Sequence, residues 1–586
     1  MPEDRRIGSI LVVDCGTVMT KALLLDRIAG EYRFVASGEA PTPRTVDGTD
    51  IIKGIFHAVA RISHVTGRQF FDEIDDLISP QVTRQQGVDA FAATVSAGEP
   101  LQVVVTGLVD DLSISSARRA AAGTYSQVSA ILGGEKSANL TDEERVREIR
   151  GTRPDVVVLA GGIDGGAERP VLDSAKAATL ACAMMDRGKR PTLLYAGNSQ
   201  LRRQVTEIVG DEAELRVVEN VRPTLEKERI WDARQELQTL FRQRKMHQIP
   251  GVATLRAWSP VPIMPTAQAF GQLIQYLWYL GDPASGVLGI DIGGGNTTIA
   301  AVFDEQLHMT IQGGLGVAFG GGRLLEERGS ECIACWIPEL IQEHELEAFM
   351  LLKGIHPASI PQTDLELWME QSLACAAIRG TMEIARPGWK GTAAQVYPDL
   401  TPICDTILIS GGPLTRVPRP GQAALVILNA VQPIGVSTLI LDRYGLAPAL
   451  GNVAAVKPLA AVEALDAGGF TNLATVVAPV GDTADPGDTV LRMNVSYEDG
   501  GVLEVEVRRG DLEVLPLPLD QEAVLELHPA KGYDVGLGGP GTGGKRQVSG
   551  GMAGLIIDAR GRPLPLPSQP AECRGQVQQW LYDIGG

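Results

Sequence analysis

Two short segments of the chain share one pattern of residues, and the pattern suits phosphate chemistry. Each is an apolar strand that ends in Asp, followed by x-Gly, a Thr-bearing turn and a second apolar strand. The segments are Leu11-Val-Val-Asp14-Cys-Gly16-Thr17-Val-Met-Thr-Lys21 and Gly289-Ile-Asp291-Ile-Gly293-Gly294-Gly295-Asn296-Thr297-Thr298. A single Asp-x-Gly turn is common, but two copies in register, each opening one half of a chain, indicate an internal repeat.

The residue types in these turns are those that hold a polyphosphate. Glycines let backbone N–H groups approach phosphate oxygens, hydroxyl side chains add donors, and a lysine supplies a point charge. Two facing carboxylates, Asp14 and Asp291, would hold a hydrated Mg²⁺, an ion that binds few carboxylates and keeps several waters. The predicted phosphate-binding residues are Asp14, Gly16, Thr17, Lys21, Gly293, Gly294, Gly295, Asn296 and Thr297.

A third apolar strand, Ile407-Leu-Ile-Ser410, ends in two glycines and a proline. Gly411, Gly412 and Pro413 present little side chain, so a flat adenosine would lie against the backbone there. The pattern alone is not specific, because Leu159-Ala-Gly161-Gly162 has the same shape.

The sequence pattern also predicts, in outline, the strands and helices that must position these turns. From Pro154 to Lys245, continuous apolar strands alternate with helices, which predicts a parallel or mixed sheet covered on both faces. Gly481–Asp488 is a polar linker candidate, and after it the runs 490–495 and 502–507 alternate apolar and polar residues. Such alternation is typical of half-buried antiparallel strands, so we expect a small β-rich domain at about 475–586.

Two other motifs are weak. Gly539–Lys545 imitates a P-loop, but Arg546 stands where Ser or Thr would hold Mg²⁺, which favours a flexible loop over an anion site. Cys332 and Cys335 have redox or metal spacing without a second pair, which favours buried thiols over metal or redox chemistry.

The composition excludes several classes of function. The chain has 586 residues, with 52 Lys and Arg against 71 Asp and Glu, and a net charge of −19. Partners such as nucleic acid or an anionic membrane surface need the opposite surplus. No apolar stretch reads as a membrane span, and Met1–Arg6 does not read as the start of a signal peptide. Seven scattered cysteines are typical of a reducing cytoplasm, which is the expected location.

The order of the motifs resembles that of the ATPase superfamily of actin, DnaK-type chaperones and sugar kinases. The matching residues are Asp14-Cys-Gly-Thr17 with Lys21, Pro265-Thr-Ala267, Asp291-Ile-Gly-Gly-Gly-Asn-Thr297 and Ser410-Gly-Gly-Pro413. The resemblance implies an α/β fold of two ribonuclease-H-like domains, with ATP and Mg²⁺ in the cleft between them. Domain I is expected at 1–285, with an inserted α/β region at about 40–250 and a completion at about 430–474. Domain II is expected at 286–430, followed by the β-rich domain.

Further motifs resemble one family within that superfamily, the glutamate mutase accessory proteins called MutL, over about residues 1–460. These motifs are Val105-Thr-Gly-Leu-Val109, residues 153–166, Tyr195-Ala-Gly-Asn198 and Glu219-Asn-Val-Arg-Pro223. The family is similar to diol dehydratase reactivating ATPases, which exchange damaged cofactor out of their enzyme. The resemblance implies an accessory or reactivating role, with subunits of an adenosylcobalamin-dependent mutase as partners, and it leaves a homo-oligomer open.

One residue departs from the superfamily pattern. In DnaK-type proteins a Glu stands before Pro-Thr-Ala and positions the attacking water, and here that position is Met264. A thioether neither orients nor deprotonates water, so we expect slow hydrolysis, with Gln268 as the candidate for orienting the water. Two alternatives stay open: an actin-like filament or assembly scaffold, and a small-molecule kinase, for which no catalytic Asp is singled out.

Overall fold

The computed structural model describes residues 7–45, 48–134, 140–481, 485, 487–567 and 570–585. Met1–Arg6 and part of the predicted linker Gly481–Asp488 lie outside these residues. Contacts divide the chain into two compact units. The main unit comprises Met1–Ala97, Ala253–His308 and Gly314–Gly586, and the inserted unit comprises Gly98–Val252 with Met309–Gly313.

One part of the main unit, which we call lobe I, is built on a five-stranded sheet. Its strands, in spatial order, are β12 (Met264–Pro265), β6 (Ala90–Val95), β1 (Ser9–Cys15), β2 (Met19–Ile28) and β3 (Glu31–Pro41). β1 runs antiparallel to β2 and parallel to β6, and β6 runs parallel to β12. β1 is buried along nearly its whole length, which explains its continuous apolar sequence.

A second part, lobe II, repeats this arrangement. Its first five strands, in spatial order, are β15 (Gln306–Gly313), β14 (Asn296–Phe303), β13 (Gly286–Ile292), β16 (Cys404–Ser410) and β17 (Gly435–Leu441), although Met309–Gly313 of β15 is counted with the inserted unit. β13 runs antiparallel to β14 and parallel to β16, and β16 runs parallel to β17. The two sheets therefore share strand order and directions, which are those of the ribonuclease-H fold, and the predicted pair of such domains is confirmed.

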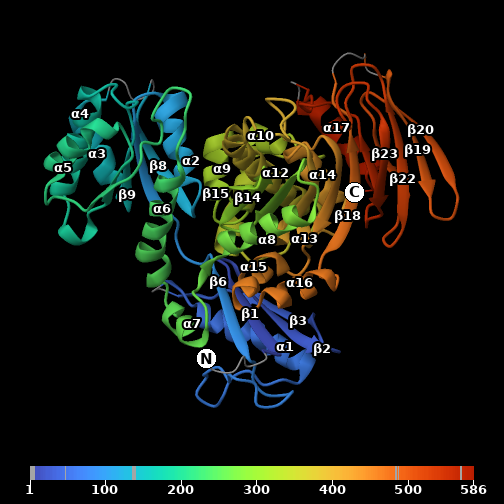
Figure 1. The fold of residues 1–586 in the computed structure, drawn as a ribbon, viewed down its shortest axis with the longest axis horizontal. Helices are drawn as coiled ribbons and strands as arrows, with labels where there is room; N and C mark the ends of the chain where they lie inside the picture. Colours follow the sequence, from blue (N-terminus) through green and yellow to red (C-terminus); the bar gives the residue numbers. More distant parts are fainter. Residues whose placement is uncertain are drawn as a thin grey trace. The chain divides into compact units, whose positions relative to one another are not determined.

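Two helices lie between the sheets of the lobes, as Figure 1 shows: α8 (Thr266–Leu280) and α15 (Leu446–Val456). α8 packs on β13 and β14, while α15 packs on β1, β6 and α8. Small residues permit this close packing, because a Cβ on Gly451 would lie 1.9 Å from the carbonyl oxygen of Ala269. α8 begins at Thr266, which lines the cleft described below.

The other helices of the main unit pack on its sheets or on one another. In lobe I, α1 (Ile51–Thr66) begins at the N-cap Asp50, ends at the left-handed Gly67 and packs on β3. The others are α7 (Val252–Trp258), α9 (Gly321–Arg328), α10 (Ser330–Ala334), α11 (Glu343–Ile355), α12 (Asp364–Ala385), α13 (Gly412–Thr415), α14 (Pro420–Ala430) and α16 (Pro458–Asp466). The long α12 is buried through most of its length, at the centre of the lobe II core.

The C-terminal part is β-rich, and three of its strands continue the sheet of lobe II. These are β18 (Thr471–Ala478), β24 (Leu555–Asp558) and β21 (Leu512–Leu515), in that order beyond β17. A separate four-stranded sheet consists of β20 (Val502–Arg508), β19 (Thr489–Tyr497), β22 (Glu522–Pro529) and β23 (Gly544–Ser549). The last helix, α17 (Pro570–Asp583), packs on α14 and β21.

The weak P-loop motif falls in this region. Lys545 lies in β23, which pairs antiparallel with β22. A P-loop lysine opens a helix, so this loop lacks the element that would complete a phosphate site.

The inserted unit is a doubly wound α/β structure. Its five parallel strands, in spatial order, are β11 (Leu215–Val217), β10 (Thr192–Tyr195), β9 (Val156–Leu159), β7 (Leu101–Gly107) and β8 (Ser126–Gly133). Its helices are α2 (Ser115–Ala121), α3 (Asp142–Thr152), α4 (Arg169–Ala183), α5 (Arg202–Val209) and α6 (Trp231–Arg244). The insertion begins at Gly98, whereas about residue 40 was predicted, because α1 and β6 belong to lobe I. In the described part of the chain, no helix combines the length and apolarity needed to cross a bilayer.

Candidate functional site

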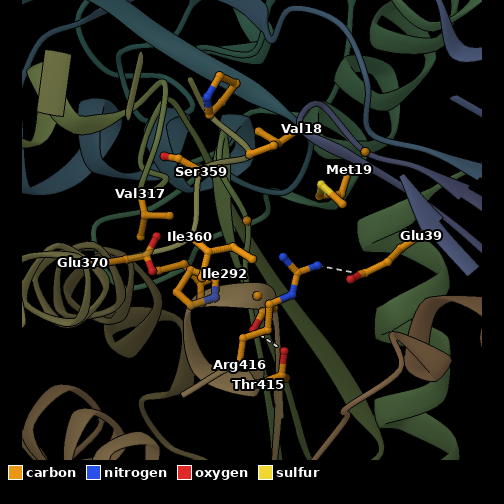
Figure 2. Close-up of a pocket in the computed structure, with 18 of the residues that line it drawn as sticks. Val18, Met19, Glu39, Ile292, Val317, Ser359, Ile360, Glu370, Thr415 and Arg416 are labelled. Carbon is orange, nitrogen blue, oxygen red and sulfur yellow. Dashed lines mark hydrogen bonds and ion pairs between the residues drawn. The ribbon is translucent and has the colours of Figure 1, made fainter. Parts of the chain in front are cut away.

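A cavity of about 640 Å³ lies in the main unit and is lined by residues of both lobes. Figure 2 shows part of its lining. The two Asp-x-Gly turns, the turn after β16 and the loop between α11 and α12 all contribute to it. Most of the residues predicted to bind nucleotide line this cavity: Asp14, Gly16, Thr17, Lys21, Asp291, Gly293, Gly294, Gly295, Asn296, Gly411, Gly412 and Pro413.

The two Asp-x-Gly hairpins have the same geometry. Asp14 lies opposite Lys21 across the β1–β2 ladder, and Asp291 lies opposite Thr298 across the β13–β14 ladder. Each turn closes with the same backbone bond: Gly16 N–H donates to Met19 O at 3.0 Å, and Gly293 N–H donates to Asn296 O at 2.9 Å. The repeat seen in the sequence is thus a repeat in structure.

The turns of the two lobes touch each other. A Cβ on Gly294 would lie 2.3 Å from Cγ2 of Val18, and one on Gly295 would lie 3.4 Å from Oγ1 of Thr17. Glycine at 294 is therefore required by the close approach of lobe I, in addition to any ligand. The contact brings the two predicted phosphate loops to the same end of the cavity.

Asp14 is held by hydroxyl groups at this end. Its Oδ1 accepts from Thr94 Oγ1 at 2.7 Å and from Thr266 Oγ1, the first residue of α8, at 2.6 Å. Burial raises the pKa of Asp14 above its ordinary 3.8, although the two hydroxyl groups and the charge of Lys21 oppose the rise. The carboxylate is oriented and costly to ionise without a cation beside it.

Asp291 stands in the equivalent position of lobe II. Burial raises its pKa to about 6, with Asp14 and Asp442 adding to the rise and Lys21 and Ser410 opposing it. Ser410, on the parallel strand β16, lies opposite Asp291. In the same way Thr94, on the parallel strand β6, lies opposite Asp14. Each carboxylate therefore faces a hydroxyl group from the next strand.

Asp442 is a third carboxylate at this point, and the sequence analysis missed it. It follows β17 directly, is 1% exposed, and accepts from Ser410 Oγ at 3.1 Å. The signal was present, because Asp442 ends a buried apolar strand as Asp14 and Asp291 do. Burial raises the pKa of Asp442 as it does for Asp14 and Asp291, and the charge of Lys21 opposes the rise at all three carboxylates.

Another part of the cavity lining has different chemistry, which the sequence analysis did not predict. Lys353 of α11 and Glu370 of α12 form a buried ion pair at 2.5 Å, and Lys353 Nζ also donates to Ser359 O at 2.6 Å. Figure 2 shows Glu370 beside Val317 and Ile360. The apolar lining here includes Val317, Pro357, Ala358, Ile360, Pro361, Leu367, Val417 and Pro418. An uncharged ring with polar edges fits this part of the lining better than a phosphate.

An ion pair spans the cavity from lobe to lobe. Arg416, just after α13, contacts Glu39 of β3 at 2.6 Å, and both side chains line the cavity (Figure 2). Both remain partly exposed, so the pair is accessible to solvent.

Two residues predicted for the site lie elsewhere. Thr297 is fully buried, and its hydroxyl donates to Leu315 O at 2.6 Å. Gln268 is exposed on α8. Neither is among the described residues that line the cavity, nor is Met264, which pairs with Thr94 at the end of β12. The prediction that the cysteine pair is buried is wrong for Cys332, which is exposed. Cys335 is half-buried, and burial raises the pKa of its thiol to about 12.

The residues present fit a hydrated Mg²⁺ bound together with phosphates. Asp14 and Asp291 both line the cavity and carry raised pKa values, so a cation beside them would relieve the cost of their charge. Among the described residues, no group of three His, Cys, Asp or Glu side chains is arranged to enclose a metal ion. Two carboxylates with water and phosphate oxygens as the other ligands match the preference of Mg²⁺.

Several solved structures show a low similarity to the chain. The nucleotide-free structure of acetone carboxylase has 11% identity and a TM-score of 0.31, over 88% of this chain and 82% of that one. A glycerol dehydratase reactivase has 10% identity and a TM-score of 0.30, over 77% and 100%. Xylulose kinase from Bifidobacterium adolescentis has 11% identity and a TM-score of 0.27, over 77% and 93%. Scores this low support no conclusion about function.

The sequence comparisons are more specific. Protein MutL of Clostridium tetanomorphum is 27% identical over 311 residues, which are 50% of this chain and 64% of that protein. The match therefore spans less than two thirds of the length of this relative. The family model described as MutL protein matches residues 10–467, which include both lobes of the cleft and the inserted unit. The chain belongs to the MutL protein family.

Proposed function

We propose that the chain is an ATP-binding, slowly hydrolysing accessory protein that reactivates an adenosylcobalamin-dependent mutase. The observation that carries the nucleotide part is the meeting of two equivalent Asp-x-Gly turns across one cavity, with Lys21 between their carboxylates. The mutase part rests on membership of the MutL family and on the role that the family resemblance implies.

The chemistry of the cavity supports one orientation of the nucleotide. Backbone N–H groups of the two glycine turns and the Lys21 ammonium suit the triphosphate. The apolar part of the lining, where Lys353 and Glu370 compensate each other's charge, suits the nucleoside, and Gly411–Pro413 lines the same cavity. Phosphates would thus lie near Asp14 and Asp291, and the base near α11 and α12.

Mg²⁺, when bound, would neutralise phosphate charge and orient the terminal phosphate. The chain's own residues would bind and orient the ion. Thr94 and Thr266 fix the Asp14 carboxylate, and Ser410 supports Asp291. Because Thr266 is the first residue of α8, the position of this helix is tied to the carboxylate at the phosphate end.

Slow hydrolysis follows from the residues near the start of α8. Met264 occupies the position of the water-positioning Glu in DnaK-type proteins, and a general base contributes typically about 10²- to 10⁴-fold to a rate. Gln268 is exposed on α8, outside the described lining of the cavity, so any role in orienting water requires a rotation of the helix. A slow step suits a timed switch better than a metabolic kinase.

The proposed cycle uses the two lobes as a clamp. Bound ATP would join the turns of lobe I and lobe II, and loss of the terminal phosphate would release them and open the cleft. The mutase would be recognised in one of these states and released in the other.

The test is affinity capture from an extract of the native cell, with the tagged full chain held in MgATP or in MgADP. We expect subunits of a cobalamin-dependent enzyme to be enriched in one of the two states. Lys21→Ala serves as the control, because it should lose the difference between the states. Absence of any cobalamin enzyme from both captures would remove the mutase assignment. ATP-dependent pelleting would favour a filament, and a phosphorylated small-molecule acceptor would favour a kinase.

A further inference from the structure

Lys21 reaches from lobe I to a turn of lobe II. A Cβ on Gly445 would lie 2.7 Å from Nζ and 2.7 Å from Cδ of Lys21, so the end of the lysine lies across the bare backbone of this glycine. Gly445 follows β17 and is the N-cap of α15. No side chain larger than hydrogen fits here unless Lys21 moves.

The turn that carries Gly445 is held firmly by Asp442. This carboxylate accepts from Leu446 N–H at 2.7 Å and from Ala447 N–H at 3.0 Å, which caps the first turn of α15. Ser410 Oγ contributes a third bond to it at 3.1 Å. A fully buried carboxylate with three donors has little freedom, so the backbone it holds offers a fixed surface to Lys21.

The backbone conformation alone does not explain this glycine. Gly445 is left-handed, with φ of +72°. Gly67, at the end of α1, has nearly the same φ of +69°, yet a Cβ added there meets nothing within 4 Å. The two glycines share a conformational requirement, and only Gly445 also has a lysine against it.

We propose that Gly445, held by Asp442, is a positioning residue that seats the Lys21 ammonium at the phosphate end of the cleft. The proposal rests on the proposed nucleotide site and deepens it. Lys21 belongs to β2 of lobe I, while its seat begins α15, which packs on α8 and on the strands of lobe I. A phosphate that binds Lys21 would therefore act on a turn of lobe II and on the helix between the lobes.

The experiment is a double-mutant cycle of Lys21→Ala and Gly445→Ala in the full chain, with Gly67→Ala as the matched control. The first measurement is the affinity for MgATP by titration calorimetry. A charge-assisted contact to phosphate is worth about 10- to 100-fold in affinity. We expect Gly445→Ala to lose about that much, Lys21→Ala to lose a similar amount, and the double variant to lose no more than Lys21→Ala. Gly67→Ala should bind as the unaltered chain does.

The second measurement is thermal stability without nucleotide. When Lys21 is present, Gly445→Ala should lower the melting temperature more than Gly67→Ala does. In the Lys21→Ala background, the two glycine substitutions should lower the melting temperature by similar amounts. If Gly445→Ala alone fails to fold, recovery of a folded protein in the double variant supports the seat. The proposal would be overturned if the affinity losses of the two single substitutions multiplied in the double variant. It would also be overturned if the Gly445→Ala variant bound MgATP with unaltered affinity. Failure of the unaltered chain to bind MgATP would instead overturn the proposed function, and the stability cycle would still test the seat.

Discussion

At the scale of one residue, the buried carboxylate of Asp291 lowers the stability of the ligand-free protein at the position proposed to bind Mg²⁺. Its pKa in the folded protein is about 6, above the ordinary 3.8, chiefly because of burial. The folded state therefore holds a proton that the unfolded state releases between these values, and stability falls as pH rises from about 4 to 6. Above pH 6 the ligand-free protein carries the full cost of this charge.

Asp291→Asn removes that cost and should also remove the metal anchor. We expect the ligand-free variant to gain about 3 kcal/mol in free energy of unfolding at pH 7.5, a gain that shrinks toward pH 5. Mg²⁺-dependent ATP binding should be lost in the variant, and in the unaltered chain it should weaken below about pH 6. Denaturant unfolding at the two pH values checks this, with the exposed Asp211→Asn as control. A variant less stable than the unaltered chain at pH 7.5 would contradict it.

Asp558 is a buried carboxylate of the opposite kind, at the end of β24. Arg560 and Arg562 each contact it at 2.8 Å. Burial alone would raise its pKa, but the two guanidinium groups outweigh burial and hold the pKa well below the ordinary value. Its contribution to stability is therefore present above about pH 4 and is lost as pH falls further.

Asp558→Asn should destabilise the protein strongly, because it leaves two buried guanidinium groups without their counter-charge. Breaking a buried pair in this way costs about 3–5 kcal/mol. Chemical unfolding at pH 7.5 measures the loss, and Asp186→Asn, in an exposed pair with Lys189, should change little. Equal effects of the two substitutions would show that the cluster adds no stability.

Single residues also mark the limit of what the sequence reveals. The place of Asp14, Lys21 and Asp291 in the cavity was predictable, because in each case the side chain and the turn lie within one short segment. Lys353 and Glu370 were not, because α11 and α12 carry no phosphate-like pattern and meet only through packing. Thr297 has a suitable side chain, yet strand alternation turns it into the core.

The elements that form the cleft make one prediction of their own. The pair of Glu39 and Arg416 joins β3 to the segment after α13 across the cavity. Because both side chains are partly exposed, the pair contributes only about 0.2–1 kcal/mol, or up to about fivefold in a rate. Arg416→Ala should speed release of a fluorescent ADP by about two- to fivefold in stopped flow.

A charge reversal tests whether the contact itself matters. Glu39→Arg with Arg416→Glu should restore slow release, while Arg33→Ala, which breaks a pair within β3 alone, should have no effect. Unaltered release in Arg416→Ala would show that the pair does not hold the cleft closed.

The order of the elements was readable in part. The alternating runs after residue 488 are β19 and β20, paired antiparallel as expected. The continuation of lobe II by β18, β24 and β21 was not visible, because pairing between strands 80 residues apart leaves no local pattern. The inserted α/β unit was clear from its apolar strands, whereas its start was hidden by α1, which resembles any amphipathic helix.

At the scale of the whole molecule, the two compact units differ in net charge. The inserted unit holds 22 basic and 22 acidic residues, so the whole surplus of −19 belongs to the main unit. A polyphosphate bound in the main unit must therefore be held locally, by backbone N–H groups, Lys21 and Mg²⁺, against a repulsive field.

The two compact units should also unfold separately. Scanning calorimetry of the full chain should show two transitions, and MgATP should shift only that of the main unit. A ligand at 100 times its Kd stabilises the unit that binds it by about 2.7 kcal/mol. A single transition, or an equal shift of both, would show that the units are coupled.

The most direct test of the account is the binding of ATP to the purified full chain by titration calorimetry, with and without Mg²⁺. The account predicts one nucleotide per chain, a requirement for Mg²⁺, and a loss of at least about tenfold in affinity for Lys21→Ala and for Asp14→Asn. No binding by the unaltered chain, or equal binding by these variants, would contradict it.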